Sequence, residues 1–142
     1  MATFNIYLNF PGNTEEAFNF YKSVLGGEFA TVMRFKDAPG SEKAPPAVQN
    51  KIMHIALPVG NGNMLMGTDE VEGMGPKSKV GNNVSIAVAP DSEAEAKKLF
   101  EGLSSGGTIT VPYEKASWGD WFGMFTDKFG IQWMINYSEK QH

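Results

Sequence analysis

The chain carries one motif twice, and the second copy begins 79 residues after the first. The first copy reads IYLNFPGNTEEAFNFYKSVLGG and the second reads SIAVAPDSEAEAKKLFEGLSSGG. In each copy, an alternating strand pattern leads through a proline into a helix whose apolar residues recur at i, i+3, i+4 and i+7. Asn13 and Ser92 are the predicted N-caps, because a glutamate follows each of them three residues later. Pairs of glycines predict where both helices end.

The segments that follow the two helices are also alike. Three strands are predicted after each helix, near residues 28–35, 52–59 and 63–67 in the first half and near 108–113, 121–126 and 131–137 in the second. The last two strands of each half form a hairpin, which turns at Gly62 in the first half and at Gly130 in the second. Residues 37–50 are predicted to be a loop, and residues 68–83 are predicted to link the two halves.

The repeat predicts an α+β fold in which two βαβββ modules pair into a curled mixed sheet. The helices are expected on the outer face, and a concave cleft is expected at the centre. A half with a single helix leaves one face of its sheet uncovered, so we expect the halves to close on each other. Residues 1–142 are therefore predicted to form one domain, with module 1 at about 1–70 and module 2 at about 83–138.

Composition narrows the range of partners. A formal net charge of -4 argues against nucleic acid, which is bound through clustered positive charge. No apolar run approaches the roughly 20 residues that span a bilayer, and the first residues do not resemble a signal peptide. The chain has no cysteine, which fits a reducing compartment, so a cytoplasmic location is expected. The expected partner is a small molecule, with no nucleic acid and no membrane.

The strand patterns predict which side chains face the cleft. Branched residues such as Leu8 and Val84 are expected to pack under the helices, while their polar or small neighbours point to the opposite face. The hairpins should supply the same cleft from His54, Ala56, Met64, Met66, Gln132, Met134 and Asn136. In the strand near 121–126, Phe122 and Met124 are the preferred cleft residues, and Trp121 is the alternative if a bulge lies at Gly130.

Three segments resemble the PhnB-like branch of the vicinal-oxygen-chelate (glyoxalase/bleomycin-resistance/dioxygenase) superfamily: NFPGNTEEAFNFYKSVLGGE, GNNVSIAV and WGDWFGMFTDKFGIQWMIN. The resemblance extends over nearly the whole chain, and the last segment is the most specific. It implies paired βαβββ modules, usually a homodimer, and a ligand pocket on the concave sheet. The superfamily includes metal-dependent lyases, isomerases and dioxygenases as well as metal-free proteins that sequester drugs, so the fold names no reaction.

The resemblance also implies four strand positions that hold a divalent metal through His, Gln or Glu. These positions fall on Tyr7, Met66, Ser85 and Met134, which together are not a set of hard or borderline ligands for Zn, Mn, Fe or Ni. Independently of the family, the chain has only two histidines, and the predicted inner strands contain no Asp or Glu. His54 is internal, and His142 is the last residue. We therefore expect no metal and no cofactor.

Several side chains are candidates for binding or catalysis. His54 could act as a general base or donate a hydrogen bond to an anionic ligand, and it could equally be a packed histidine tied to a neighbouring carbonyl. The predicted ligand-binding residues are Tyr7, Asn9, Met66, Ser85, Phe122, Gln132 and Met134. The aromatic residues between 113 and 133 could wall a pocket, form a dimer seam or fill the core of the second half.

These features leave three functions open. The first is a metal-independent small-molecule-binding protein that works as a homodimer. The second is a metal-dependent lyase, isomerase or dioxygenase of the same superfamily. The third is a structural or regulatory dimerisation module. Whether the chain catalyses a reaction is left open by the sequence, and no glycine-rich nucleotide motif points to a methyltransferase.

Overall fold

The computed structural model describes residues 2–40, 44–73 and 75–139, and His142 lies outside the described residues. The chain divides into two compact units, unit 1 (Met1–Lys79) and unit 2 (Val80–His142). Each unit has its own four-stranded mixed sheet and one long helix. The predicted α+β class and the two βαβββ modules are therefore confirmed. That the two modules share one curled sheet and one cleft stays a prediction.

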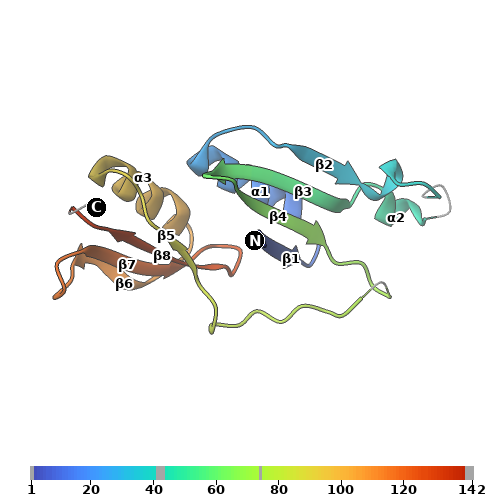
Figure 1. Ribbon diagram of the computed structural model, residues 1–142. Coiled ribbons are helices and arrows are strands. Elements are labelled where there is room, and N and C mark those ends of the chain that lie inside the picture. Colours follow the sequence, from blue (N-terminus) through green and yellow to red (C-terminus); the bar gives the residue numbers. More distant parts are fainter. Residues whose placement is uncertain (1, 41–43, 74, 140–142) are drawn as a thin grey trace. The chain divides into compact units, whose positions relative to one another are not determined.

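Unit 1 contains the first copy of the motif (Figure 1). Its elements are β1 (Ile6–Phe10), α1 (Thr14–Leu25), β2 (Thr31–Arg34), β3 (Ile52–Gly60) and β4 (Asn63–Asp69). The strand order is β1-β4-β3-β2, with β1 parallel to β4 and the other pairs antiparallel. The hairpin turns as predicted, because Asn61 and Gly62 both adopt positive φ angles, of 55° and 77°.

Between β2 and β3, unit 1 departs from the predicted loop. A 3₁₀ turn, η1 (Phe35–Asp37), and a short helix, α2 (Pro46–Gln49), occupy part of this segment. Pro46 stands at the first helical position, where its fixed φ angle and missing N–H are tolerated. A single helical turn has too few residues to display the apolar periodicity on which the sequence prediction relied.

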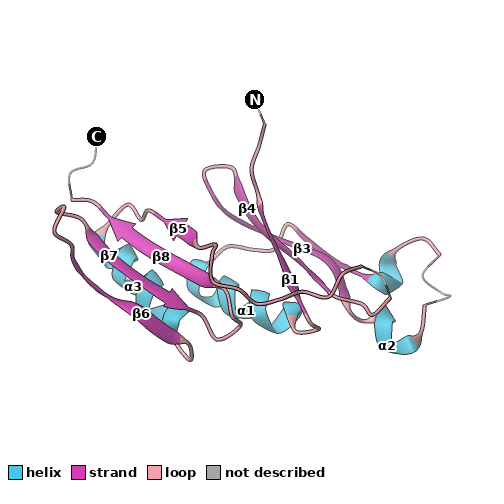
Figure 2. Cartoon of the chain, turned by 90° about the horizontal axis from the view of Figure 1, so that it is seen from below, coloured by secondary structure: helices cyan, strands magenta, loops and turns pink. Residues whose placement is uncertain are grey.

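Unit 2 contains the second copy. Its elements are β5 (Ile86–Val88), α3 (Glu93–Ser104), β6 (Thr108–Lys115), β7 (Trp121–Thr126) and β8 (Gln132–Tyr137). The strand order β5-β8-β7-β6 matches that of unit 1, with β5 parallel to β8. Seen from below, this sheet lies in front of α3 (Figure 2). The described residues between β4 and β5 form no helix or strand, in agreement with the predicted linker.

The two helices begin at the predicted residues but are capped differently. The Ser92 hydroxyl accepts a hydrogen bond from the Glu95 N–H at 3.1 Å, as expected of an N-cap. The Asn13 side chain makes no capping bond. Instead, the Thr14 N–H donates to Asp69 Oδ1 at 3.0 Å. Asn13 is therefore the N-cap residue, as predicted, but Asp69 takes the place of its side chain, because the parallel pairing of β1 and β4 brings this buried carboxylate to the helix end.

Each helix covers one face of its sheet and forms the core with it. The helix face of β4 is formed by alternate buried residues, Leu65 among them, and that of β8 by Trp133 and Ile135. The prediction that Val84 packs under the helix is wrong. Val84 is 75% exposed, because β5 begins only at Ile86. Within the described residues, every helix is too short or too polar to cross a membrane.

Candidate functional site

The sheet of unit 1 has one face turned away from α1, which we call open face 1. Its central cross-strand row runs from Tyr7 of β1 through Met66 of β4 and Ala56 of β3 to Thr31 of β2. Neighbouring strand partners point to the same side of a sheet, so these side chains share one face. His54 lies two residues before Ala56 and therefore belongs to the same face. Open face 1 thus combines a phenol, an imidazole and a thioether, as the sequence predicted.

Tyr7 and His54 are in direct contact on open face 1. The Tyr7 hydroxyl lies 3.4 Å from His54 Nδ1, at the long end of the hydrogen-bonding range. The two rings stack with their centroids 5.8 Å apart. Tyr7 is 45% exposed, so the pair is accessible to a small molecule in solution. In the described part of the chain, the Tyr7 hydroxyl is the one side-chain hydrogen-bond partner of the His54 ring, so no carboxylate orients it.

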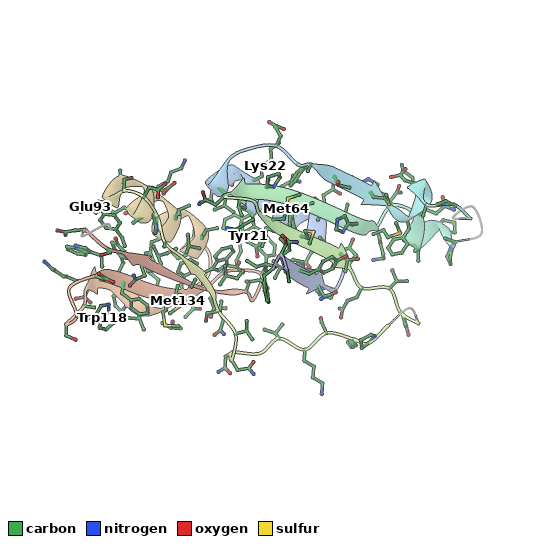
Figure 3. All side chains as sticks on the ribbon, in the orientation of Figure 1. Tyr21, Lys22, Met64, Glu93, Trp118 and Met134 are labelled. Atoms are coloured by element: carbon green, nitrogen blue, oxygen red, sulfur yellow. The ribbon has the colours of Figure 1, made fainter. Side chains whose placement is uncertain are left out.

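The sheet of unit 2 has a corresponding face turned away from α3, which we call open face 2. One row joins Glu114 of β6, Phe122 of β7 and Asn136 of β8. The next row, which is apolar, consists of Val111, Met124, Met134 and Ala87. Phe122 and Met124 lie on this open face, because the alternate residues Gly123 and Phe125 are buried on the helix side, and their role in a cleft stays a prediction. Met134 is labelled in Figure 3, on the side of the sheet away from α3.

Trp121, the alternative cleft residue, lies on the opposite side from Phe122. Its ring stacks on Tyr113, with centroids 5.9 Å apart, and its indole N–H donates to Glu139 Oε1 at 2.7 Å. The register between β7 and β8 runs without a shift from Trp121 to Thr126. Burial raises the pKa of the Tyr113 hydroxyl, and the charges of Glu93 and Tyr137 add to the effect. This side of the sheet therefore belongs to the core.

Trp118 lies on the loop between β6 and β7 and reaches Phe122. Their rings meet edge to face, with centroids 5.6 Å apart, and Trp118 is 63% exposed. Trp118 is labelled in Figure 3. The loop is closed by a hydrogen bond from the Ala116 N–H to the Asp120 carbonyl at 2.7 Å. Gly119 adopts a positive φ angle of 102° in this turn. An exposed indole is thus added to open face 2.

Glu114 corrects the prediction that the inner strands contain no acidic residue. The sequence reading ended this strand at Tyr113, whereas β6 continues to Lys115. Two irregularities in the pairing of β6 with β7 change the alternation, and Glu114 becomes the partner of Phe122. A bulge of this kind depends on the partner strand, so period-two alternation could not have predicted the position of Glu114.

Two of the polar candidate residues form side-chain hydrogen bonds within unit 2. Gln132 Nε2 donates to the Val84 carbonyl at 2.9 Å, which ties β8 to the segment before β5. Asn136 Nδ2 donates to Asp120 Oδ2 at 3.1 Å. Asn9 is exposed at the end of β1, beside Thr68. Gln132 and Asn136 therefore have structural bonds, and the ligand-binding roles of Asn9 and Gln132 stay predictions.

β5 pairs with β8 in a register that differs from the one expected from the repeat, in which Ser85 corresponds to Tyr7. Ala87, not Ser85, is the Cα partner of Met134, as Tyr7 is the partner of Met66. The first helical residue follows Tyr7 by seven positions in unit 1 and Ala87 by six positions in unit 2, so the 79-residue shift of the helices becomes an 80-residue shift in these strands. Ser85 lies one residue before β5, and its ligand-binding role stays a prediction.

Within the described residues, no three or more His, Asp or Glu side chains come together in a group that could hold a metal ion. The two buried carboxylates have structural roles. Asp69 Oδ2 accepts from the Ile52 N–H at 2.8 Å, in addition to its bond with α1. Asp127 accepts from two backbone N–H groups of its turn and, at 2.8 Å, from the Trp133 indole. Both carboxylates therefore stabilise the chain connections rather than face a ligand.

Comparison with known proteins places this geometry in a family. Residues 2–136 match the family described as 3-demethylubiquinone-9 3-methyltransferase. The chain is similar to the crystal structure of protein PA1353 from Pseudomonas aeruginosa, with 37% identity and a TM-score of 0.84, over 97% of this chain and 98% of that one. It is also similar to a putative 3-demethylubiquinone-9 3-methyltransferase, PhnB protein, from Bacillus cereus, with 24% identity and a TM-score of 0.76, over 96% and 100% of the two chains.

The fold extends to more distant proteins. A glyoxylase/bleomycin resistance protein/dioxygenase domain from Frankia sp. EAN1pec matches with a TM-score of 0.65 and 14% identity, over 100% of this chain and 95% of that one. At this level of identity the likeness concerns the fold alone. It agrees with the α+β class and with the glyoxalase-like architecture of each unit.

Proposed function

The chain belongs to the PhnB-like family described as 3-demethylubiquinone-9 3-methyltransferase, and within it we propose that the protein binds a small organic molecule without the help of a metal ion. The proposal concerns binding. It does not extend to methyl transfer, which the family description names, nor to any other particular reaction. The open faces of the two sheets are the proposed binding surfaces.

The Tyr7–His54 contact is the observation that carries the proposal. A stacked phenol and imidazole on an accessible sheet face, beside the Met66 thioether, offer both apolar contact and directed hydrogen bonds. With Nδ1 facing the Tyr7 hydroxyl, Nε2 is the nitrogen through which His54 donates to or accepts from a ligand. His54 is the residue that would exchange a proton if the bound molecule reacts.

The composition of the faces supports a ligand with a large apolar part. The thioethers Met66, Met124 and Met134 are flexible and polarisable, and they adapt to ligands of irregular shape. Three of the four positions where the family resemblance implies metal ligands carry a thioether or a phenol, and the fourth, expected at Ser85, falls on Ala87 by strand register. Oxygen- and nitrogen-rich ligand sets suit Mg, Mn and Zn better than these groups do.

Mass spectrometry under native conditions, together with metal analysis of the untagged protein, tests the proposal. We expect protein that carries substoichiometric metal and retains a co-purified organic compound, or that is stabilised against heat by members of a small-molecule library. Ligand-induced stabilisation should fall in His54→Ala and persist in Asn19→Ala, whose side chain is exposed on α1. One tightly held divalent ion per chain, lost together with thermal stability on chelation, would contradict the proposal.

A further inference from the structure

Open face 2 contains an aromatic pair that its unit does not cover. Trp118 is 63% exposed although its ring already contacts Phe122. An indole left in water forgoes roughly 2 kcal/mol of burial free energy, and exposed apolar side chains of this size often mark binding sites. The loop from Ala116 to Asp120 holds the ring in place through its own backbone hydrogen bonds.

Two carboxylates lie close to this aromatic pair. Glu114 is the strand partner of Phe122, and Asp120 is bound to Asn136, the other strand partner of Phe122. Within the residues that the structure describes, neither carboxylate forms an ion pair. The neighbouring cation, Lys115, is the strand partner of Trp121 and therefore lies on the opposite side of the sheet. The charge next to Phe122 on this side of the sheet is therefore negative, from Glu114 and Asp120.

From these contacts we propose that Trp118, Phe122 and Glu114 form a subsite for a planar aromatic cation. The indole offers the ring face that attracts cations most strongly, and a flat ligand can also stack on it. Glu114 supplies the complementary charge at the same edge of the sheet, while the row of Val111, Met124 and Met134 contacts the apolar part of the ligand. The inference rests on the proposed small-molecule function and specifies the class of ligand for unit 2.

Equilibrium dialysis with three tricyclic compounds of similar size tests the subsite: proflavine as the cation, acridone as the neutral compound and 9-anthracenecarboxylate as the anion. We expect proflavine to bind at least about 10-fold more tightly than 9-anthracenecarboxylate, with acridone between them, because ring contact is common to all three and charge is not. Trp118→Ala should weaken proflavine binding roughly 10-fold, and Glu114→Gln should weaken it about 3-fold.

Two variants separate the subsite from general effects. Trp118→Phe should retain most of the affinity, because it keeps a ring over Phe122. Glu101→Gln removes an exposed carboxylate of α3 and should leave proflavine binding unchanged, which controls for net charge. Circular dichroism confirms that each variant is folded.

Three results would overturn the inference. These are equal affinity for the three compounds, no binding of proflavine, or full proflavine binding by Trp118→Ala. If acridone binds without a preference for the cation, the proposed small-molecule function stands and only the charge-selective subsite fails. If none of the three binds while His54-dependent ligands do, the inference fails and the role of open face 1 is unaffected.

Discussion

Phe18 of α1 lies directly against Gly67 of β4. A Cβ atom at position 67 would be 2.6 Å from the Phe18 Cε1 atom, which is closer than real Cβ contacts. In unit 2, a Cβ at Gly123 would be equally close to the Phe100 ring, at 2.6 Å. The glycine is paired with an isoleucine in both sheets, with Ile55 in one and Ile135 in the other. Each helix therefore approaches its sheet at a glycine.

Gly67→Ala should destabilise the protein by about 2 kcal/mol, because the added methyl overpacks the core beneath Phe18. The double variant Gly67→Ala, Phe18→Leu should lose about 1 kcal/mol less than the sum of the two single variants, since the smaller side chain makes room for the methyl. Urea unfolding measures the free energies. Strict additivity would show that the ring does not limit position 67.

Gly123→Ala should behave differently. Its Cβ would also lie 2.9 Å from the Tyr113 Cα atom, which is backbone and cannot move as a side chain does. Phe100→Leu should therefore relieve little of the loss, which we expect to be about 3 kcal/mol. Gly81→Ala serves as the control, because a Cβ there would make only an ordinary contact at 3.7 Å.

Asp69→Ala should destabilise the protein by roughly 3 kcal/mol. The substitution removes the acceptor of two backbone N–H groups, those of Thr14 and Ile52, in a buried position. Asn13→Ala should cost far less, because the Asn13 side chain makes no capping bond. Thermal or urea unfolding of both variants measures the difference, and a larger effect at Asn13 would contradict the capping role of Asp69.

Tyr113→Phe should leave stability unchanged or raise it by up to about 1 kcal/mol. Within the described residues, the buried Tyr113 hydroxyl has no hydrogen-bond partner. Its removal therefore eliminates a desolvation cost, while the ring contacts with Phe100 and Trp121 are kept. Because the folded-state pKa of Tyr113 lies above its ordinary value of 10.0, ionisation favours the unfolded chain, and the protein loses stability as the pH rises above 10.0 through the folded-state pKa. The variant should lose less stability between neutral and strongly alkaline pH, and a clear loss of stability at pH 7 would contradict this account.

The Glu15–Arg34 ion pair should make stability sensitive to acid. Arg34 donates two hydrogen bonds to the carboxylate, and these lower the Glu15 pKa below its ordinary value of 4.5. The pair therefore stabilises the protein above about pH 4.5, and this contribution is lost as the pH falls through the lower folded-state pKa. Since Glu15 is half exposed, Glu15→Gln should cost only about 0.5 kcal/mol at pH 7 and progressively less as the pH falls below 4.5. Glu16→Gln, on the same helix, is the control, and equal effects of the two variants would argue against the pair.

Much of the candidate site could be predicted from alternation along single strands. Tyr7, His54 and Met66 share a face, and so do Phe122 and Met134, because alternation divides each strand into two sets of side chains and the apolar set of every strand packs against the helix. Trp118 could not be assigned in this way, since it lies on a loop and reaches the face only through the turn at Gly119.

By itself, the sequence determined the two βαβββ units, their helix boundaries and both hairpin turns, because these follow from local periodicity, caps and glycines with positive φ angles. Only the tertiary structure decided the strand register. That register places Ala87 beside Met134, Glu114 beside Phe122, and Asp69 at the start of α1. Register depends on connection length and on bulges, and shifting it by one residue transfers a side chain to the other face of the sheet.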